Sequence, residues 1–161
     1  MRLPLAQGLV EGPPGLAEQL QRHQAAVDAA HGLAVAGSEA WVVEQRAHRV
    51  LRVQKGGADP FPLRYGEPGA VSFPSAIAVC PGEWIAIADL GNHRVQRFDL
   101  EGHFIDSFAP ERAGPDQPVQ LLAVGVSPDC RRLYLADSKG DRLLITRPDG
   151  EVIREVRDVG D

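Results

Sequence analysis

One segment of this chain occurs three times, and this repeat constrains the fold more than any other feature of the sequence. The copies span Ala40–Val50, Trp84–Val95 and Leu133–Leu143. In each copy an apolar run leads to an acidic residue, an Arg follows five positions later, and an aliphatic residue comes next. The acidic residues of successive copies are 45 and 48 positions apart. A period in this range is typical of repeated β units, so we expect three similar antiparallel units along the chain.

Each copy shows the same order of strand and turn signals. Apolar and β-branched runs alternate with Gly, Pro, Asp and Ser, and pairs such as Pro81-Gly82 suit tight antiparallel hairpins. The first two runs of a copy are apolar at nearly every position, whereas the third alternates. We therefore expect burial to decrease from the first strand outward, as in a propeller blade. The expected strands are 32–35, 41–43, 49–53 and a weak fourth near 62–65 in the first copy, 76–79, 84–88, 93–98 and 103–108 in the second, and 122–126, 132–136, 141–146 and 151–156 in the third.

Residues 1–30 do not share the repeat and form a separate N-terminal extension. Pro13-Pro14 is a helix start signal, and apolar residues such as Leu16 and Leu20 follow at helical spacing. We therefore expect a short helix over about 15–28, with a long loop as the alternative, and a strand of a neighbouring or incomplete unit over 3–10.

The bulk composition argues against several classes of protein. A net charge of −5 disfavours a dedicated nucleic-acid binder, which carries a surplus of Lys and Arg. No apolar run approaches the roughly 20 residues that span a bilayer, so we expect no contact with a membrane. The first residues lack the apolar core of a signal peptide, and we expect a cytoplasmic location. Cys80 and Cys130 are then expected as unpaired thiols, although each follows the first strand of its own copy and a disulfide between neighbouring units stays open.

The middle copy resembles an NHL repeat. The match runs over Phe73–Val79 and Ile87–Gly102, and it places Asn92 and His93 in the loop from which the family takes part of its name. The third copy carries Asp141 where this His is expected. The resemblance implies an all-β fold, a partial NHL-type β-propeller over about 31–157 with three blades of four antiparallel strands, at about 31–68, 73–117 and 118–157.

Three blades cannot close a ring, because each blade turns the stack by only a fraction of a full turn. An open arc leaves edge strands and two blade faces in water, which promotes aggregation. Three arrangements resolve this problem. Two chains form a dimer that completes a six-bladed ring, the blades belong to a longer chain, or the N-terminal extension covers an open end of a monomer.

The repeated charged residues are expected to be structural. A set that recurs in every copy has the same role in every copy, and an Asp in a turn accepts backbone N–H groups while a nearby Arg pairs with it. We expect Asp89→Ala to destabilise the fold by about 1–3 kcal/mol if it leaves buried donors unsatisfied. The set comprises Glu44, which stands in place of the Asp, with Arg49, Asp89, Arg94, Asp137 and Arg142.

His31 is the candidate for metal binding. It opens the first strand of the first copy, near the expected central axis, and the resemblance extends to peptidyl-hydroxyglycine amidating lyases, which hold zinc on this axis through His residues. A catalytic zinc needs about three protein ligands, but the equivalent positions in the other copies are Ser75 and Leu122. We therefore expect no cofactor. An enzyme of lyase or hydrolase type, with a metal in the central funnel, is an alternative function.

In a propeller, the turns between second and third strands and the segments between blades share one face, and function in such folds resides in loops. We therefore expect a non-catalytic binding or scaffold module, with a protein as the partner. RNA binding is a further alternative, because the first copy is locally basic, yet aromatic residues for base stacking are few. The candidate contact residues are Arg46, His48, Tyr65, Asn92, His93, Arg112 and Lys139.

Overall fold

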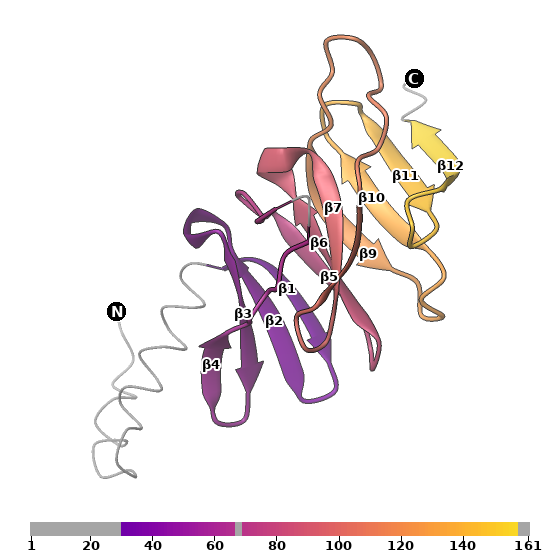
Figure 1. Ribbon diagram of the computed structural model, residues 1–161. Helices are drawn as coiled ribbons and strands as arrows, with labels where there is room; N and C mark the ends of the chain where they lie inside the picture. Colours follow the sequence, from indigo (N-terminus) through magenta and orange to yellow (C-terminus); the bar gives the residue numbers. More distant parts are fainter. Residues whose placement is uncertain (1–29, 67–68, 158–161) are drawn as a thin grey trace, which may run out of the picture.

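The computed structural model describes residues 30–66 and 69–157 and shows an all-β chain, as predicted. The strands form three four-stranded antiparallel sheets that follow one another along the chain (Figure 1), and we call them blades 1, 2 and 3. Blade 1 consists of β1 (Ala30–Ala36), β2 (Glu39–Glu44), β3 (Arg49–Gln54) and β4 (Gly57–Pro60), blade 2 of β5 (Ala76–Cys80), β6 (Trp84–Asp89), β7 (Arg94–Asp99) and β8 (Phe104–Phe108), and blade 3 of β9 (Leu121–Val126), β10 (Leu133–Asp137), β11 (Arg142–Thr146) and β12 (Val152–Arg157).

The first strands of the blades, β1, β5 and β9, are neighbours in the stack (Figure 1). β1 and β5 approach closely at Gly32, where a Cβ atom would lie 2.9 Å from the Cα atom of Ala76, so the contact requires glycine. The starts of β5 and β9 are joined by a hydrogen bond in which Oγ of Ser75 donates to the carbonyl of Leu121 at 2.6 Å. The blades therefore stand face to face along their first strands, which is the arrangement of a propeller.

Two of the three hydrophobic clusters lie between neighbouring blades, and a small third cluster, Val42 and Leu51 with Val53, lies on the face of blade 1 turned away from blade 2. Every residue of β6 is buried, because the middle blade has a neighbour on each side. The cluster between blades 1 and 2 includes Trp41, Val43, Val50, Ile77, Val79, Ile85, Ile87 and Phe98. The cluster between blades 2 and 3 includes Trp84, Ala86, Ala88, Val95, Leu121, Leu133, Leu135 and Leu144.

The fourth strand of blade 1 is Gly57–Pro60, so the expectation of a strand near 62–65 was wrong. A two-residue turn after Gln54 pairs that residue directly with the first residue of β4, and the hairpin closes early. The residues that follow run instead toward blade 2, where Arg64 forms a bridge with His103.

The expected order of burial was also wrong for blade 1. Leu33 and Val35 of its first strand are each 62% exposed, whereas its second strand is largely buried. A first strand depends on the neighbouring blades for cover. Among the described residues, blade 1 has such a neighbour on one side only.

The helix expected over 15–28 and the strand expected over 3–10 lie outside the described residues, so both stay predictions. The helical segments within the described ranges are the short 3₁₀ turns η2 (Gln45–Ala47) and η3 (Leu90–Asn92). No helix in those ranges is long and apolar enough to cross a membrane.

Candidate functional site

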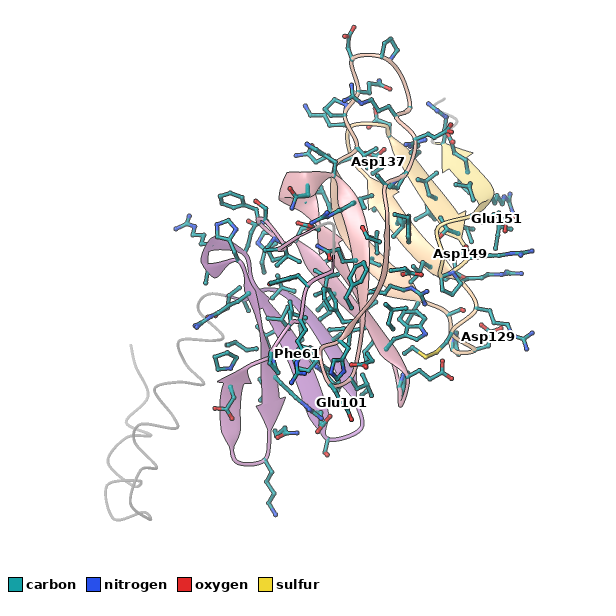
Figure 2. The ribbon with its side chains drawn as sticks, in the orientation of Figure 1. Phe61, Glu101, Asp129, Asp137, Asp149 and Glu151 are labelled. Atoms are coloured by element: carbon teal, nitrogen blue, oxygen red, sulfur yellow. A yellow bond between two sulfur atoms is a disulfide. The ribbon has the colours of Figure 1, made fainter. Side chains whose placement is uncertain are left out.

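The turns after β2, β6 and β10 lie at one end of the sheets, and we call this end the loop face. Figure 2 shows Asp137, which precedes the third of these turns, toward this end, and Glu101 and Asp129 at the opposite end. Segments between blades cross the same end, because the N–H of Ser138 donates to the carbonyl of Gln120 at 3.0 Å. The candidate contact residues of the three turns therefore share one end of the molecule.

The side chain of Asp89 is fully buried and joins the β6–β7 hairpin to the segment that precedes blade 2. Its Oδ1 atom accepts the backbone N–H of Ser72 at 2.7 Å, and its Oδ2 atom accepts Nε–H of Arg94 at 2.7 Å. The same guanidinium donates to the carbonyls of Gly69 and Ala70 at 3.1 and 3.2 Å. The ion pair therefore fastens blade 2 to the segment between blades 1 and 2.

The acid–arginine pairs of the other blades have a related form, and we call the three pairs the clamps. In blade 3, Asp137 accepts the N–H of Gln120 and Nε–H of Arg142, each at 2.9 Å. In blade 1, the buried carboxylate of Glu44 pairs with the half-exposed Arg49. The repeated acidic residues are thus occupied by partners within the chain, which is a structural arrangement rather than one open to a ligand.

Three of the candidate contact residues also have internal partners. The amide of Asn92 donates to the clamp carboxylate of blade 2 at 3.0 Å. Nδ1 of His48 accepts the backbone N–H of Phe73 at 2.9 Å, and the two rings meet edge to face at 4.2 Å. Nδ1 of His93 lies 2.6 Å from the carbonyl of Val119, so it carries the proton and donates. Both histidines therefore reach the segment that leads into the following blade.

The backbone explains why these histidines can make such contacts. His48 and His93 end the turns η2 and η3 with φ angles of 51° and 56°, in the left-handed region that few residues other than glycine adopt. Asp141 has the same conformation, with a φ of 46°, at the equivalent position of blade 3. The sequence showed the histidines in turns but gave no sign of their contacts with segments 25 residues away or more.

The remaining candidates are exposed. Arg46, Arg112 and Lys139 are exposed on the surface, and among the described residues their side chains make no hydrogen bond or ion pair. The ring of Tyr65 packs edge to face on Phe98 at 6.0 Å while 40% of the residue stays exposed. Burial raises the pKa of the Tyr65 hydroxyl, so it is a neutral donor at physiological pH. The loop face therefore offers three cations, while Tyr65 lies on the segment that begins beside the β7–β8 turn, where Arg64 pairs with His103, and leads toward this face at Gly69 and Ala70.

A cleft of about 500 Å³ lies beside this surface, between the segment 109–112 and the outer strands of blade 3. Two of its arginines are neutralised within the chain, because Arg142 pairs with Asp137 and Arg157 pairs with Glu155. Arg112 also lines the cleft and has no such partner. The cleft is thus lined by one of the three cations of the loop face.

His31 lies on β1 and is exposed. Its equivalents do not complete a metal site, because Ser75 is buried and bonded to Leu121, and Leu122 is an exposed aliphatic residue. Among the described residues, no group of three potential metal ligands includes His31.

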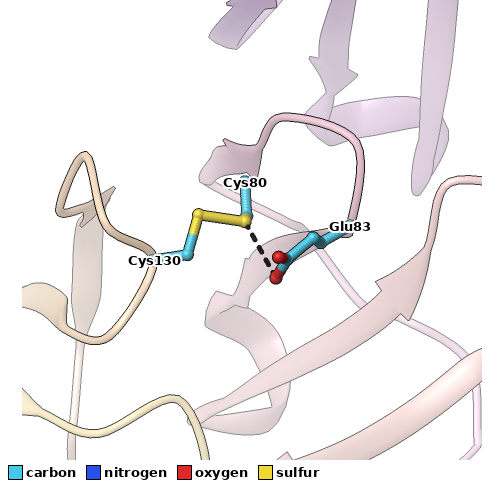
Figure 3. A group of neighbouring side chains, drawn as sticks. All are labelled: Cys80, Glu83 and Cys130. Atoms are coloured by element: carbon cyan, nitrogen blue, oxygen red, sulfur yellow. Dashed lines mark hydrogen bonds between the residues drawn. A yellow bond between two sulfur atoms is a disulfide. The ribbon is translucent and has the colours of Figure 1, made fainter.

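Cys80 and Cys130 form a disulfide between blades 2 and 3, with their Cα atoms 5.7 Å apart (Figure 3). The expectation of two unpaired thiols was therefore wrong. Cys130 has a left-handed backbone, with a φ of 59°, in the turn between β9 and β10. The Glu83 carboxylate lies 3.4 Å from Sγ of Cys80 as a contact, because a disulfide sulfur has no proton to donate.

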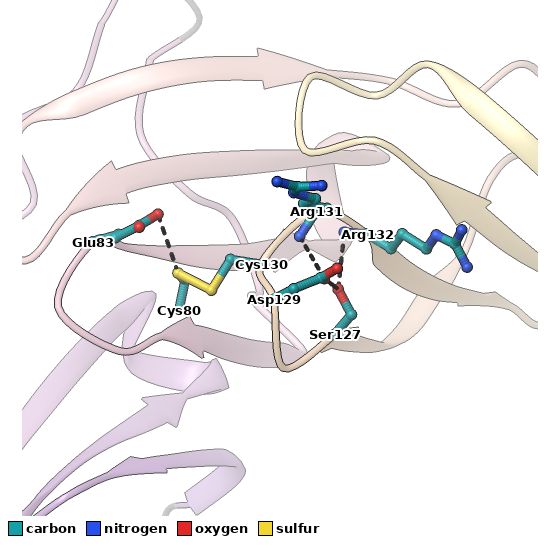
Figure 4. The surroundings of a disulfide bond; sticks show 7 residues. All are labelled: Cys80, Glu83, Ser127, Asp129, Cys130, Arg131 and Arg132. Carbon is teal, nitrogen blue, oxygen red and sulfur yellow. Dashed lines mark hydrogen bonds between the residues drawn. A yellow bond between two sulfur atoms is a disulfide. The ribbon is translucent and has the colours of Figure 1, made fainter.

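The turn that carries Cys130 is ordered by its own polar contacts (Figure 4). The Asp129 carboxylate accepts Oγ–H of Ser127 at 2.6 Å and the N–H of Arg131 at 3.1 Å. This turn is held beside Cys80 at the end of the molecule opposite the loop face. Because disulfides persist mainly in oxidising compartments, the cytoplasmic location stays a prediction that the bond does not favour.

The pKa of Asp137 predicts that the fold is sensitive to acid. Burial by itself raises the pKa of this carboxyl, but the N–H of Gln120, the guanidinium of Arg142 and the N–H of Gly140 outweigh burial, and the pKa lies below its ordinary value of 3.8. The charged form is therefore favoured by folding. Its contribution to stability is complete well above the unfolded pKa and is lost as the pH falls through that value toward the folded pKa.

We expect the melting temperature of the wild type to fall more steeply than that of Asp137→Asn as the pH is lowered from about 6 to about 3, because the amide has no proton to gain. Circular dichroism melts across this range measure the difference. Asp149→Asn, in an exposed turn, serves as the control and should follow the wild type. Parallel profiles for the wild type and Asp137→Asn would contradict the prediction.

Comparison with known proteins supports the fold class. No protein-family profile matches the sequence, and no curated protein sequence matches it. The structure is similar to Kuenenia stuttgartiensis hydrazine synthase, with a TM-score of 0.61, 18% identity, and coverage of 81% of this chain and 36% of that one. It is similar to streptogramin B lyase, with a TM-score of 0.63, 13% identity, and coverage of 83% and 42%. It is also similar to virginiamycin B lyase from Staphylococcus aureus, with a TM-score of 0.61, 14% identity, and coverage of 83% and 43%.

These neighbours define the class of the chain as a β-propeller-like repeat protein. The chain spans about two fifths of the length of the structures that it matches. At these identities the likeness concerns the fold alone, and the chemistry of the neighbours is not transferred to this chain.

Proposed function

We propose that this chain is a non-catalytic binding module, built from three NHL-like blades, whose loop face binds an acidic segment of a partner protein. The observation that carries the proposal is that some polar side chains on this face have partners inside the chain and others do not. The clamp carboxylates and the turn histidines are engaged within the chain, whereas Arg46, Arg112 and Lys139 are exposed and have no side-chain partner in the part of the chain that the structure describes. A chain with a net charge of −5 thus presents available cations at the end where its turns converge.

The face would recognise a pattern of charges rather than total charge. Glu111 and Asp141 are exposed beside the cations, so a uniformly acidic ligand meets repulsion as well as attraction. On the segment that leads to this face, the half-exposed ring of Tyr65 offers an amphipathic contact of the kind that is common in protein interfaces. A peptide that alternates acidic and apolar residues matches this surface better than a nucleic acid with its regular phosphates.

Selection from a displayed library of random 12-residue peptides tests the proposal. We expect enrichment of acidic peptides whose affinity falls about tenfold or more for the triple variant Arg46→Glu, Arg112→Glu and Lys139→Glu, because each exposed ion pair contributes up to about 1 kcal/mol. Fluorescence anisotropy with synthetic copies of the enriched peptides measures the change.

The matched control reverses three arginines at the opposite end of the sheets. Arg131, Arg132 and Arg147 line a cleft of about 620 Å³ beside the disulfide, and their reversal to Glu should leave peptide affinity unchanged. Equal losses in both triple variants would show a nonspecific charge effect and would contradict the proposal. Salt-sensitive binding of a uridine oligomer through the loop face, without peptide enrichment, would replace the proposal by RNA binding.

A further inference from the structure

Blade 1 turns one sheet face away from blade 2, and we call it the leading face. Residues paired directly across antiparallel strands lie on the same face of a sheet, so the register identifies its members. None of them is charged. Leu33 and Val35 on the first strand are each 62% exposed, whereas Val42, Leu51 and Ala58 on the following strands are buried. The leading face consists of Leu33, Val35, Ala40, Val42, Leu51, Val53, Ala58 and Pro60.

Blade 3 also has one sheet face that points away from blade 2, on the other side of the stack, and we call it the trailing face. Its single charged member is Arg154, while Leu143 and Val156 are 36% and 39% exposed. The register places Ala123, Gly125, Tyr134, Ala136, Leu143, Ile145, Arg154 and Val156 on it. Exposed apolar surfaces of this kind mark interaction sites in soluble proteins.

A trailing face packs on a leading face twice within the chain, between blades 1 and 2 and between blades 2 and 3. The leading face of blade 1 and the trailing face of blade 3 are the two sides of the same kind of contact. Between blades 1 and 2, Val50 on the trailing side and Ile77 on the leading side belong to one core cluster. Between blades 2 and 3, the equivalent residues Val95 and Val124 belong to the other cluster. Alignment of the clamps and of the strand register gives the equivalent residues on the outer faces. Leu143 on the trailing face matches Val50 and Val95, and Leu33 on the leading face matches Ile77 and Val124.

A second set of positions follows the same rule. Trp41 and Val79 meet in the first cluster, and Ala86 and Val126 meet in the second. The corresponding residues of the open faces are Tyr134 and Val35. The open surfaces therefore carry an apolar residue at each position where the two internal contacts carry one. Ile77 is 4% exposed and Val95 is fully buried, whereas Leu33 and Leu143 are exposed on faces that no other blade of the described residues adjoins.

We propose that the trailing face of one copy of this chain packs on the leading face of a second copy, and that two copies close a ring of six blades. A contact between two different faces closes into a ring or grows into a filament, depending on the rotation that it imposes. Propellers contain typically about 4–8 blades, and six is the only multiple of three in that range. Two copies of the three described blades, joined by two identical contacts, give six blades.

Light-scattering mass over a range of concentrations tests the proposal on the full chain. We expect a dimer of twice the chain mass of 17.4 kDa. Leu33→Glu on the leading face and Leu143→Glu on the trailing face should each shift the protein to the monomer, with an unchanged far-ultraviolet circular dichroism spectrum. Ile105→Glu, at a 43% exposed position on the outer strand of blade 2, is the matched control and should remain dimeric.

Three other outcomes would overturn the proposal. A wild-type monomer at every concentration means that the open faces are covered within one chain or by further blades of a longer protein. A mass that grows without limit means that the contact forms filaments rather than a closed pair. A dimer that survives both glutamate substitutions uses another surface. If a glutamate variant fails to fold, Leu33→Ser and Leu143→Ser provide milder replacements for the same comparison.

Discussion

Loss of the Cys80–Cys130 disulfide is expected to lower the free energy of unfolding by about 4 kcal/mol, because the bond closes a loop of roughly 50 residues in the unfolded chain. At this chain length the change corresponds to a fall of roughly 8–16 °C in the melting temperature. The loss of stability should mainly affect the contact between blades 2 and 3, since the bond joins the end of β5 to the turn after β9.

Thermal melts of the oxidised protein with and without dithiothreitol measure this effect. The double variant Cys80→Ser and Cys130→Ser should melt at the temperature of the reduced wild type and should not respond to the reductant. A response in the double variant would show that dithiothreitol acts elsewhere. A difference of less than about 1 kcal/mol between oxidised and reduced protein would contradict a stabilising role for the bond.

Replacement of Asp89 by Ala is expected to destabilise the chain by about 3–5 kcal/mol, since it leaves a largely buried guanidinium without its carboxylate. This is more than the loss of about 1–3 kcal/mol expected from the sequence, where the turn N–H groups and a nearby Arg were considered as partners but Asn92 and Gln96 were not. In the structure the carboxylate also accepts from the side chains of Arg94, Asn92 and Gln96. Each of these donors loses this one acceptor, as does the N–H of Ser72.

Urea unfolding followed by tryptophan fluorescence measures this loss, because Trp84 lies at the start of the same strand. Asp59→Ala provides the control at an exposed position of β4, where a change of no more than about 0.5 kcal/mol is expected. If Asp89→Ala were no more destabilising than this control, the clamps would not hold the blades together.

The sequence predicted the architecture well because its signals are local. Alternation of strand and turn residues placed most strands within one or two residues of their observed ends, as for β6 and β7. The recurrence of an acid and an Arg across one hairpin indicated an ion pair, since β6 and β7 bring Asp89 and Arg94 directly opposite each other. The fourth strand of blade 1 was misplaced because a Lys-Gly turn was not recognised as a hairpin.

The features that the sequence did not predict depend on contacts between distant segments. The disulfide requires the turn of one blade to lie beside the strand end of another, and 50 residues separate its cysteines. The histidines of the loop face were assigned to ligand contact because their backbone partners, at Phe73 and Val119, lie 25 and 26 residues ahead. Burial of the first strands could not be read from their apolar composition, since it depends on whether another blade covers them.

The central claim is that the three copies fold into blades that stand side by side, with their first strands as neighbours. Peptide mapping of the disulfide by mass spectrometry, after equilibration of the full chain in a glutathione redox buffer, tests this claim most directly. We expect one intramolecular link, between Cys80 and Cys130, whose Cα atoms the stacked blades hold 5.7 Å apart. Two cysteines that stay unlinked under oxidising conditions, or that link only between chains, would contradict it.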